Sequence, residues 1–426
     1  MSYTSAVTLS NPQAPGDGRR PSPDHAQALS ASRRLSPAAA FLLLASITVS
    51  FLAGSSAPTP LYPIYMAQWG LTPLMITMIF GIYALAVLLA LLIAGRLSDH
   101  LGRRPVLLTA VLAQAATMVL FATATSLAGL LVARVVQGLT TGAAIGAVGA
   151  AMIDLDKTRG TVANAVAPPF GTATGALVAG VLVQYLPLPT HLVYAVFGIV
   201  FILQAVGLAF MTDSIAPRGG VLPSLKPQLS LPRATREPLL LALPVLVAVW
   251  ALAGFYGSLG PMLVRGMLGS NSPLLGGLSL FVLAACGGLS VLVFQHREPK
   301  DMMMFGVASL FAGVAIAVLS LPYSAIAFFF LGTAIAGVGF GAGFQGAVRT
   351  VVPFAAPHER AGVLSIVFII SYIAMGVPAV VAGWMIAQHG NILATAQTFG
   401  AAIMALACTA LLGRVLRARR YAEAVR

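Results

Sequence analysis

The segment that decides the fold reads Gly95-Arg-Leu-Ser-Asp99-His-Leu-Gly102-Arg103-Arg104-Pro. It follows an apolar stretch at about residues 74–97 and leads into another at about 105–124. Each stretch is close to the ~20 residues that a helix needs to span the hydrocarbon core of a bilayer. A short basic segment between two such stretches predicts a chain that crosses a membrane more than once.

The composition of the whole chain supports this prediction. Of 426 residues, 58% are apolar and 8% are charged, whereas a soluble globular protein carries about 25% charged residues. The 24 basic and 11 acidic side chains are too few to cover a water-facing surface of this size. Composition therefore excludes a soluble enzyme, a disordered protein and a nucleic-acid-binding protein.

The basic residues gather in every second loop and at both ends of the chain. The opposite set of loops contains Arg265 as its one basic residue. This is the positive-inside bias, and it predicts that both termini are cytoplasmic. The net charge of +13 is then a consequence of topology and not a sign of a polyanionic partner. Abundant arginine and alanine are typical of GC-rich bacterial genomes, so we expect a bacterial cytoplasmic (inner) membrane.

The length of the apolar stretches predicts twelve spanning helices. They lie at about residues 38–66, 74–97, 105–124, 127–152, 160–185, 190–211, 238–262, 273–295, 302–320, 324–348, 362–386 and 393–413. An even number of spans agrees with two cytoplasmic termini.

A polar stretch at 212–237 divides these spans into two halves of similar length, 37–211 and 238–414. Equal halves suggest an internal repeat, with a substrate path at the interface between the halves. We expect 1–36 to be a disordered cytoplasmic tail, 212–237 a central cytoplasmic loop and 415–426 a basic cytoplasmic tail. The predicted fold class is thus an all-α membrane protein with two pseudo-symmetric six-helix bundles.

The spacing of Gly95, Asp99, Gly102, Arg103 and Arg104 resembles the signature G-x-L-x-D-x-x-G-R-R of the major facilitator superfamily. An ordinary positive-inside loop would explain the arginines but not this spacing. The resemblance implies that these residues form a gating motif. It also implies that the carboxylate of Asp99 pairs with the adjacent arginine and with the N-terminus of a helix in the other half, where the helix dipole favours a negative charge.

Arg134, Gln137 and Gly138 resemble the second motif of the family, R-x-x-Q-G. A charged residue inside a span is rare and functional by default, so we expect these three residues to serve coupling or substrate binding. The alternative is an arginine that snorkels to the outer interface, ~10 Å away. Because no predicted span has an interior carboxylate, the partners left for Arg134 are carbonyls, Gln137 or other amides, water and an anionic substrate.

Gly171, Gly175 and Gly180 resemble the antiporter motif G-x-x-x-G-P-x-x-G-G, with alanine in place of the proline and of one glycine. Gly376 and Gly383 stand near the corresponding positions of the second half. Small residues at this spacing allow helices to approach closely, and plain helix packing is the alternative explanation. On this basis we expect Gly175→Leu to be disruptive and Gly175→Ala to be mild.

Gly54, Pro60 and Pro63 stand at the positions of the motif G-x(5)-P-x-x-P of the twelve-helix drug:proton antiporters, which this region resembles. The alternative is a helix end that prolines break at the outer interface, with Tyr62, Tyr65 and Trp69 in an aromatic belt. The two explanations are compatible.

The resemblance implies a secondary active transporter. We expect a proton-coupled exporter of small apolar or anionic organic molecules that works by alternating access, because cation exchange would need an interior carboxylate. The alternatives are an uptake carrier for a small metabolite and a non-transporting membrane receptor. The sequence contains no catalytic or metal-ligand constellation, so we expect no enzyme activity, no metal and no cofactor. The expected partners are a small-molecule substrate, protons and the lipid bilayer, with the chain as a monomer and no nucleic acid.

Overall fold

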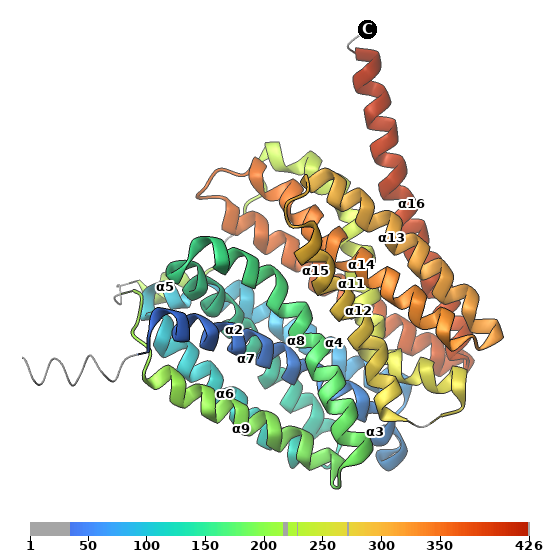
Figure 1. Cartoon of the computed structure of the whole chain (residues 1–426), viewed down its shortest axis with the longest axis horizontal. Helices are drawn as coiled ribbons and strands as arrows, with labels where there is room; N and C mark the ends of the chain where they lie inside the picture. Colours follow the sequence, from blue (N-terminus) through green and yellow to red (C-terminus); the bar gives the residue numbers. More distant parts are fainter. Residues whose placement is uncertain (1–34, 216–219, 228, 271, 425–426) are drawn as a thin grey trace, which may run out of the picture.

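The computed structural model describes residues 35–215, 220–227, 229–270 and 272–424, and every regular element in these ranges is a helix (Figure 1). Twelve of the described helices are long and apolar enough to cross a membrane. The predicted all-α membrane fold with twelve spans is therefore confirmed. Most of the predicted N-terminal tail lies outside the described residues.

The first bundle contains six spans, of which the first is broken into three pieces. Its elements are α2 (Pro37–Ser56), η1 (Thr59–Leu61), α3 (Tyr62–Trp69), α4 (Pro73–Ala94), the short α5 (Leu97–Leu101), α6 (Arg103–Ala122), α7 (Leu127–Leu155), α8 (Lys157–Tyr185) and α9 (Pro189–Ala209).

The second bundle follows a linker that contains the short helix α10 (Val221–Ser224). Its elements are α11 (Arg233–Leu268), α12 (Pro273–Phe294), α13 (Pro299–Ser320), η2 (Leu321–Tyr323), α14 (Ile326–Val351), η3 (Val352–Phe354), α15 (Arg360–His389) and α16 (Ile392–Ala424).

Local sequence signals explain where several spans begin. The side chains of Ser36, Thr72, Ser126 and Ser272 each accept a hydrogen bond from the backbone N–H three residues further on. Such an N-cap satisfies one of the donors that the first turn of a helix leaves free. Prolines close to the beginning of α2, α4 and α12 also favour helix initiation there.

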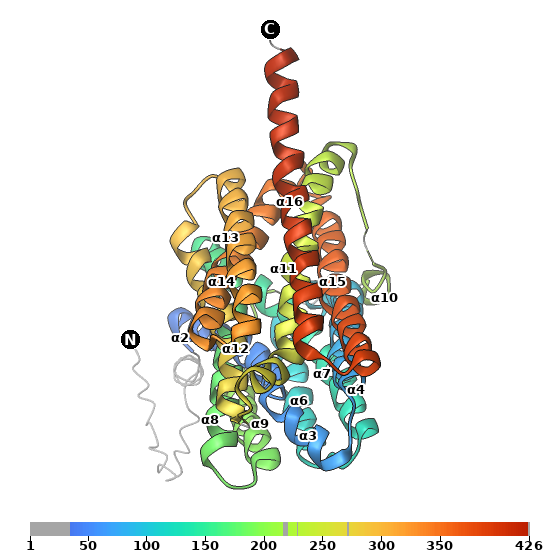
Figure 2. The ribbon, with the colours of Figure 1, turned by 90° about the vertical axis from the view of Figure 1, so that its right-hand side faces the viewer.

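Two helices extend into segments expected to be loop or tail. Helix α11 begins at Arg233, inside the predicted central loop, immediately after Pro232. Helix α16 continues to Ala424, and Figure 2 shows it extending beyond the neighbouring helices. The residues after Gly413 include several alanines and arginines, one leucine and no proline, so their intrinsic propensity favours continuation of the helix.

Buried apolar side chains form one core in each bundle and a third cluster between the bundles. This third cluster consists of Phe80, Tyr83, Ala84, Val87 and Leu88 of α4 with Tyr372, Met375 and Ala379 of α15. We call it the seam cluster.

The contacts between the bundles repeat the same pattern twice. The fifth span of the first bundle, α8, packs against the second span of the other bundle, α12; likewise α15 packs against α4. A Cβ on Gly180 would lie 3.2 Å from Leu274 Cα, and one on Gly376 would lie 3.5 Å from Ala84 Cβ. This reciprocal packing is what an internal repeat of six helices predicts.

The two ends of the molecule differ in how the bundles are joined. We call the end with the turn between α4 and α6 the motif end, and the end with α3 the opposite end. At the opposite end, Thr59 Oγ1 donates to Gly257 O (2.9 Å) and Ser272 Oγ donates to Gln184 Oε1 (2.9 Å), and both bonds connect the bundles.

Candidate functional site

The arginines of the motif loop are anchored inside the first bundle. Arg103 is buried; its Nη1 donates to Ser98 Oγ (2.7 Å) and forms an ion pair with Asp99, as expected. Its Nε donates to Asp154 Oδ2 (3.1 Å) close to the end of α7. The guanidinium of Arg103 therefore fixes the loop to α7. Gly95 makes a separate contact with α7, because a Cβ on Gly146 of α7 would stand 3.3 Å from Gly95 O.

The second half of the motif loop is held by the chain that leaves α9. Asp213 Oδ1 accepts from the backbone N–H of Arg103 (2.9 Å), which makes Asp213 a cap for α6. Gly102 has φ +95°, and a Cβ there would overlap the Asp213 carboxylate, so both the conformation and the contact require glycine. Arg104 donates to the last carbonyls of α9, Leu208 O (3.0 Å) and Ala209 O (2.6 Å).

Sequence reasoning identified the five motif residues but not their acidic partners. Asp154 and Asp213 follow the last apolar residues of two predicted spans, and an acidic residue at the basic end of a span was the available signal. The carboxylate of Asp99 is 48% exposed, and its ion-pair partner Arg103 belongs to the same bundle.

Arg134 lies at the centre of the first bundle and is 0% exposed. Its Nη1 donates to Ser55 O (2.8 Å) and Gln137 Oε1 (2.7 Å), and its Nη2 donates to Tyr62 Oη (2.5 Å). The ring centroids of Tyr83 and Phe121 lie 5.2 and 5.7 Å from its Cζ, within the range of cation–π attraction. The side chain thus points toward α2 and does not snorkel to the interface.

The rest of the second motif completes this polar core. Gln137 Nε2 donates to Gly54 O (3.0 Å), and Thr140 donates to Gln114 Oε1. A Cβ on Gly138 would lie 2.7 Å from Tyr83 O, so glycine is needed for α7 to pack against α4. The predicted residues Arg134, Gln137, Gly138 and Gly54 are therefore brought together by the fold.

The predicted packing glycines divide into two groups. Gly171 and Gly175 of α8 contact α2 within the first bundle, and a Cβ on Gly175 would overlap Ala53 O. The expectation that Gly175→Ala is mild is therefore wrong, because the two helices meet backbone to backbone. Gly180 contacts α12, while Gly376 and Gly383 contact α4, so these three lie between the bundles.

The prolines of the first span lie at the opposite end. Pro60 is part of η1, the break in the span, and a Cβ on Gly277 of α12 would stand 3.1 Å from Pro60 Cγ. Pro63 is the second residue of the continuation α3 and lines a small crevice together with Pro261 of α11. Both prolines are thus placed where the two bundles touch.

A set of aromatic residues that the sequence did not single out lies next to the seam cluster. Trp250 of α11 packs on the seam cluster, and its ring centroid lies 5.3 Å from Phe344, 6.0 Å from Phe340 and 5.7 Å from Tyr372. The indole Nε1–H of Trp250 is buried without a hydrogen-bond partner among the described residues. The i, i+4 spacing of the two phenylalanines was the available sequence signal.

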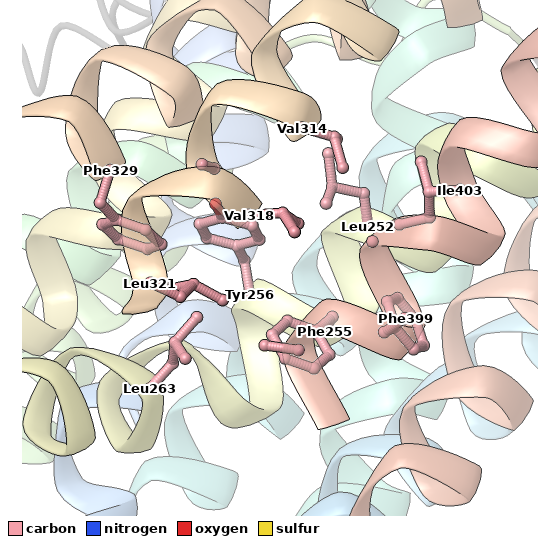
Figure 3. Close-up of a pocket in the computed structure, with 13 residues that line it drawn as sticks. Leu252, Phe255, Tyr256, Leu263, Val314, Val318, Leu321, Phe329, Phe399 and Ile403 are labelled. Carbon is pink, nitrogen blue, oxygen red and sulfur yellow. The ribbon is translucent and has the colours of Figure 1, made fainter. Parts of the chain in front are cut away.

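An apolar cavity inside the second bundle is not a substrate site. It lies between α11, α13, α14 and α16, and Figure 3 shows it surrounded by rings that include Phe255, Phe329 and Phe399. Its volume of about 30 Å³ is close to that of one water molecule, whereas sites for organic ligands enclose about 300 Å³ or more. The described residues also contain no group of three His, Cys, Asp or Glu that could hold a metal.

Two six-helix bundles that meet along one seam, with the motif loop at one end, are the architecture of a membrane transporter. Residues 44–377 match the family model described as Major Facilitator Superfamily, and the chain belongs to this family. A comparison with curated protein sequences finds no significant match.

Solved structures of several transporters share the fold. The nucleoside transporter NupG has a TM-score of 0.65 at 12% identity, over 87% of this chain and 98% of that one. A bacterial homologue of the human lysosomal transporter Spinster, in an inward-facing and occupied conformation, has a TM-score of 0.66 at 15% identity, over 87% of this chain and 94% of that one. The human organic anion transporter MFSD10 (TETRAN) has a TM-score of 0.63 at 17% identity, over 88% of this chain and 100% of that one.

Proposed function

We propose that this major facilitator transporter is a proton-coupled exporter of small apolar or anionic organic molecules. The observation that carries the proposal is the uncharged, aromatic character of the region where the bundles meet. Phe80 and Tyr83 face Tyr372 across the seam, and Trp250 packs beside them. Binding sites for small organic molecules are mostly apolar, with few polar groups that fix orientation.

The unpartnered indole of Trp250 suggests which polar group a substrate carries. A buried donor without an acceptor is unfavourable, and a carboxylate or carbonyl oxygen on the substrate would accept this hydrogen bond. The rings of Phe340, Phe344 and Tyr372 would pack against the apolar body of the same molecule. The cluster therefore suits an apolar molecule with an acceptor.

The distribution of charge argues against a cationic substrate. In the described part of the chain, the acidic residues lie in loops or near the ends of the spans, and none lies in the middle of a span. A cation at the seam would have no carboxylate to offset its cost of burial. A neutral molecule does not face this penalty, whereas an anion would pay a similar burial cost that a hydrogen bond from Trp250 Nε1 would offset in part.

Alternating access would use the two ends of the seam in turn. The hydrogen bonds of Thr59 and Ser272 hold the bundles together at the opposite end, which favours a path open at the motif end. We propose that Asp99, which is half-exposed in this state, meets the second bundle when the motif end closes. The positive-inside bias makes the motif end cytoplasmic, in a bacterial inner membrane.

We propose proton coupling because the glycines of α8 resemble an antiporter motif. The pattern of Gly54, Pro60 and Pro63 likewise resembles that of the drug:proton antiporters. Uptake of a small metabolite is the second candidate, since the similar structures include a nucleoside transporter. A non-transporting receptor is the third.

A susceptibility panel tests the substrate class. Cells that lack their own exporters would express the wild type, Trp250→Phe or Trp250→Leu, and receive toxic neutral, anionic and cationic compounds. We expect the wild type to protect against neutral and anionic compounds. Trp250→Phe keeps the ring but lacks the N–H, so it should lose protection against the anions first, and Trp250→Leu should lose both. Protection confined to cations contradicts the proposed substrate class, and increased sensitivity indicates uptake.

Purified protein in liposomes tests the coupling. An imposed proton gradient should drive accumulation of a compound found in the panel, and a protonophore should abolish that accumulation. Equal movement with and without the gradient would contradict proton coupling.

A further inference from the structure

The outside of the first bundle carries an apolar groove between α6 and α9. Figure 1 shows α9 at the edge of the bundle with α6 beside it, and the two helices pack on each other. The groove encloses about 700 Å³, well above the ~300 Å³ at which sites for organic ligands begin. No charged side chain lines it, and its one polar side-chain group is the hydroxyl of Tyr194. The groove therefore offers a ligand mainly apolar contacts.

Small residues between large ones form the groove. Ala116 of α6 and Ala195 of α9 line it and are exposed. Leu112 and Val119, which are also exposed, stand one turn before and one turn after Ala116, and the exposed Ile199 stands one turn after Ala195. Residues three and four apart share one face of a helix. The alanines thus lie in a channel between large apolar side chains.

The floor of the groove is closely packed. Met118 and Tyr194 are buried there, and a Cβ on Gly198 would lie 3.6 Å from Met118 Cβ. The ring of Tyr194 stacks on Phe121 with a centroid distance of 5.0 Å, and its hydroxyl forms a hydrogen bond with Tyr65 Oη (3.0 Å). Packing and a hydrogen bond hold this floor in place, so the groove is a fixed feature of the fold.

The length of the groove matches one leaflet of a bilayer. On α6 its lining extends from Leu112 to Ala122, the last residue of the helix. Ten residues of helix cover ~15 Å, which is half of the ~30 Å hydrocarbon core. Helix α6 begins at Arg103, at the motif end, so the groove occupies the half of the bundle toward the opposite end.

The shape of the groove favours a lipid chain over a second copy of the protein. Membrane helices associate through small residues that let their backbones approach. Here Leu112, Val119 and Ile199 project beside the alanines and would hold a second helix, ~10 Å wide with its side chains, away from them. An acyl chain is narrow and flexible enough to lie between these side chains.

We propose that one phospholipid of the leaflet at the opposite end binds with an acyl chain in this groove. The carboxyl end of the chain lies close to Ala122, and its terminal methyl group lies close to Leu112 and Leu203, at the middle of the bilayer. The chain packs on the floor formed by Met118 and Tyr194. The proposal concerns the outside of the first bundle and does not rest on the substrate or the transport direction proposed above.

Photoreactive lipids test the position and direction of the chain. The purified full-length protein in detergent receives phosphatidylethanolamine with a diazirine either at the terminal carbon of one chain or next to its carboxyl group. We expect the terminal probe to label the protein around Leu112 and Leu203, and the other probe to label it around Ala122. Even labelling of α6, α9 and α13 would overturn the proposal, and the reverse order of labels would refute the assignment to this leaflet.

A variant with a filled groove tests the affinity. Ala116→Leu combined with Ala195→Leu adds bulk at two exposed positions, where the fold has room for it. Native mass spectrometry measures the concentration of phosphatidylethanolamine at which the first lipid adduct is half-formed. This concentration should rise about fivefold or more, since overpacking shifts an equilibrium by about 5- to 150-fold. An unchanged concentration would refute the groove as the binding site.

Ala312→Leu is the matched control. Ala312 is an exposed alanine of α13, the third span of the second bundle, as α6 is of the first, and it lines none of the cavities described above. This variant should keep the wild-type lipid affinity, and an equal loss of affinity would refute the assignment to the groove. The same spectra report the mass of the protein. A dimer in the wild type that the filled variant loses would identify a second copy as the occupant and overturn the proposal.

Discussion

Replacing Gly175 with alanine tests whether α2 and α8 touch through their backbones. A Cβ at residue 175 would overlap Ala53 O and the Oγ of Ser56, so one of the helices must shift. Overpacking of this kind costs about 1–3 kcal/mol, which corresponds to a factor of about 5–150 in an equilibrium constant. Ser56 also donates to Thr172 O (2.8 Å) across the same contact, and separating the helices would weaken this bond.

The assay is thermal unfolding together with transport. A loss of 1 kcal/mol lowers the midpoint by about 2–4 °C for a bundle of this size, so Gly175→Ala should lower it by about 2 °C or more. Helix α8 also packs on α12 of the second bundle, and a shifted α8 should therefore change the balance between transport states. We expect Gly175→Leu to exceed the alanine variant in both measurements.

Gly376→Ala is the matched control, since Gly376 lies on α15, the fifth span of the second bundle. Its Cβ would lie 3.5 Å from Ala84 Cβ, an ordinary contact that requires no movement. The free energy of unfolding of this variant should stay within about 0.5 kcal/mol of the wild-type value, so the midpoint should hardly change. If Gly175→Ala also leaves the midpoint unchanged, the backbone contact between α2 and α8 does not limit stability and the reasoning is refuted.

Three further predictions concern gating, coupling and topology. Asp99→Asn should leave the protein in the membrane but lower transport, because it removes the charge that pairs with Arg103; full transport would reduce the motif to a topological signal. Arg134→Gln should keep substrate binding, since Arg134 is 0% exposed, yet lose gradient-driven flux, and unchanged flux would remove Arg134 from the mechanism. A single cysteine at Arg159 should resist impermeant thiol reagents in intact cells while one at Ser126 reacts; labelling of position 159 from outside contradicts the proposed orientation.

The sequence predicted the fold because a membrane limits the possible structures. Spans must satisfy their backbone hydrogen bonds internally, so long apolar stretches are helices, and their number and halves follow from counting. The extents of α11 and α16 could not be predicted in this way. Both helices continue outside the apolar stretches, at Arg233–Glu237 and beyond Gly413, where helix propensity favours them. A prediction based on the length of apolar stretches does not detect these extensions.

The site was predicted as far as its residues are locally encoded. Arg103 and Arg134 were found from their motifs, but their partners Asp154 and Ser55 come from other helices, and no spacing along the chain places them together. The error at Gly175 has the same origin. The sequence indicated a close helix contact but could not show that the facing atom was the carbonyl of Ala53, which decides whether a methyl group fits.

The two bundles repeat a helix arrangement but not a chemistry, and the difference lies in their fourth spans. Helix α7 places Arg134 in a polar core that faces α2. Its counterpart α14 instead packs directly on α13, since a Cβ on Gly332 would lie 2.7 Å from Gly313 O, and α14 also carries two of the aromatic residues next to Trp250. A buried cation in one bundle and an aromatic cluster in the other cannot exchange roles. We therefore propose that the aromatic residues of α14 contribute to substrate selectivity together with the seam cluster, and that Arg134 serves the charge-dependent step.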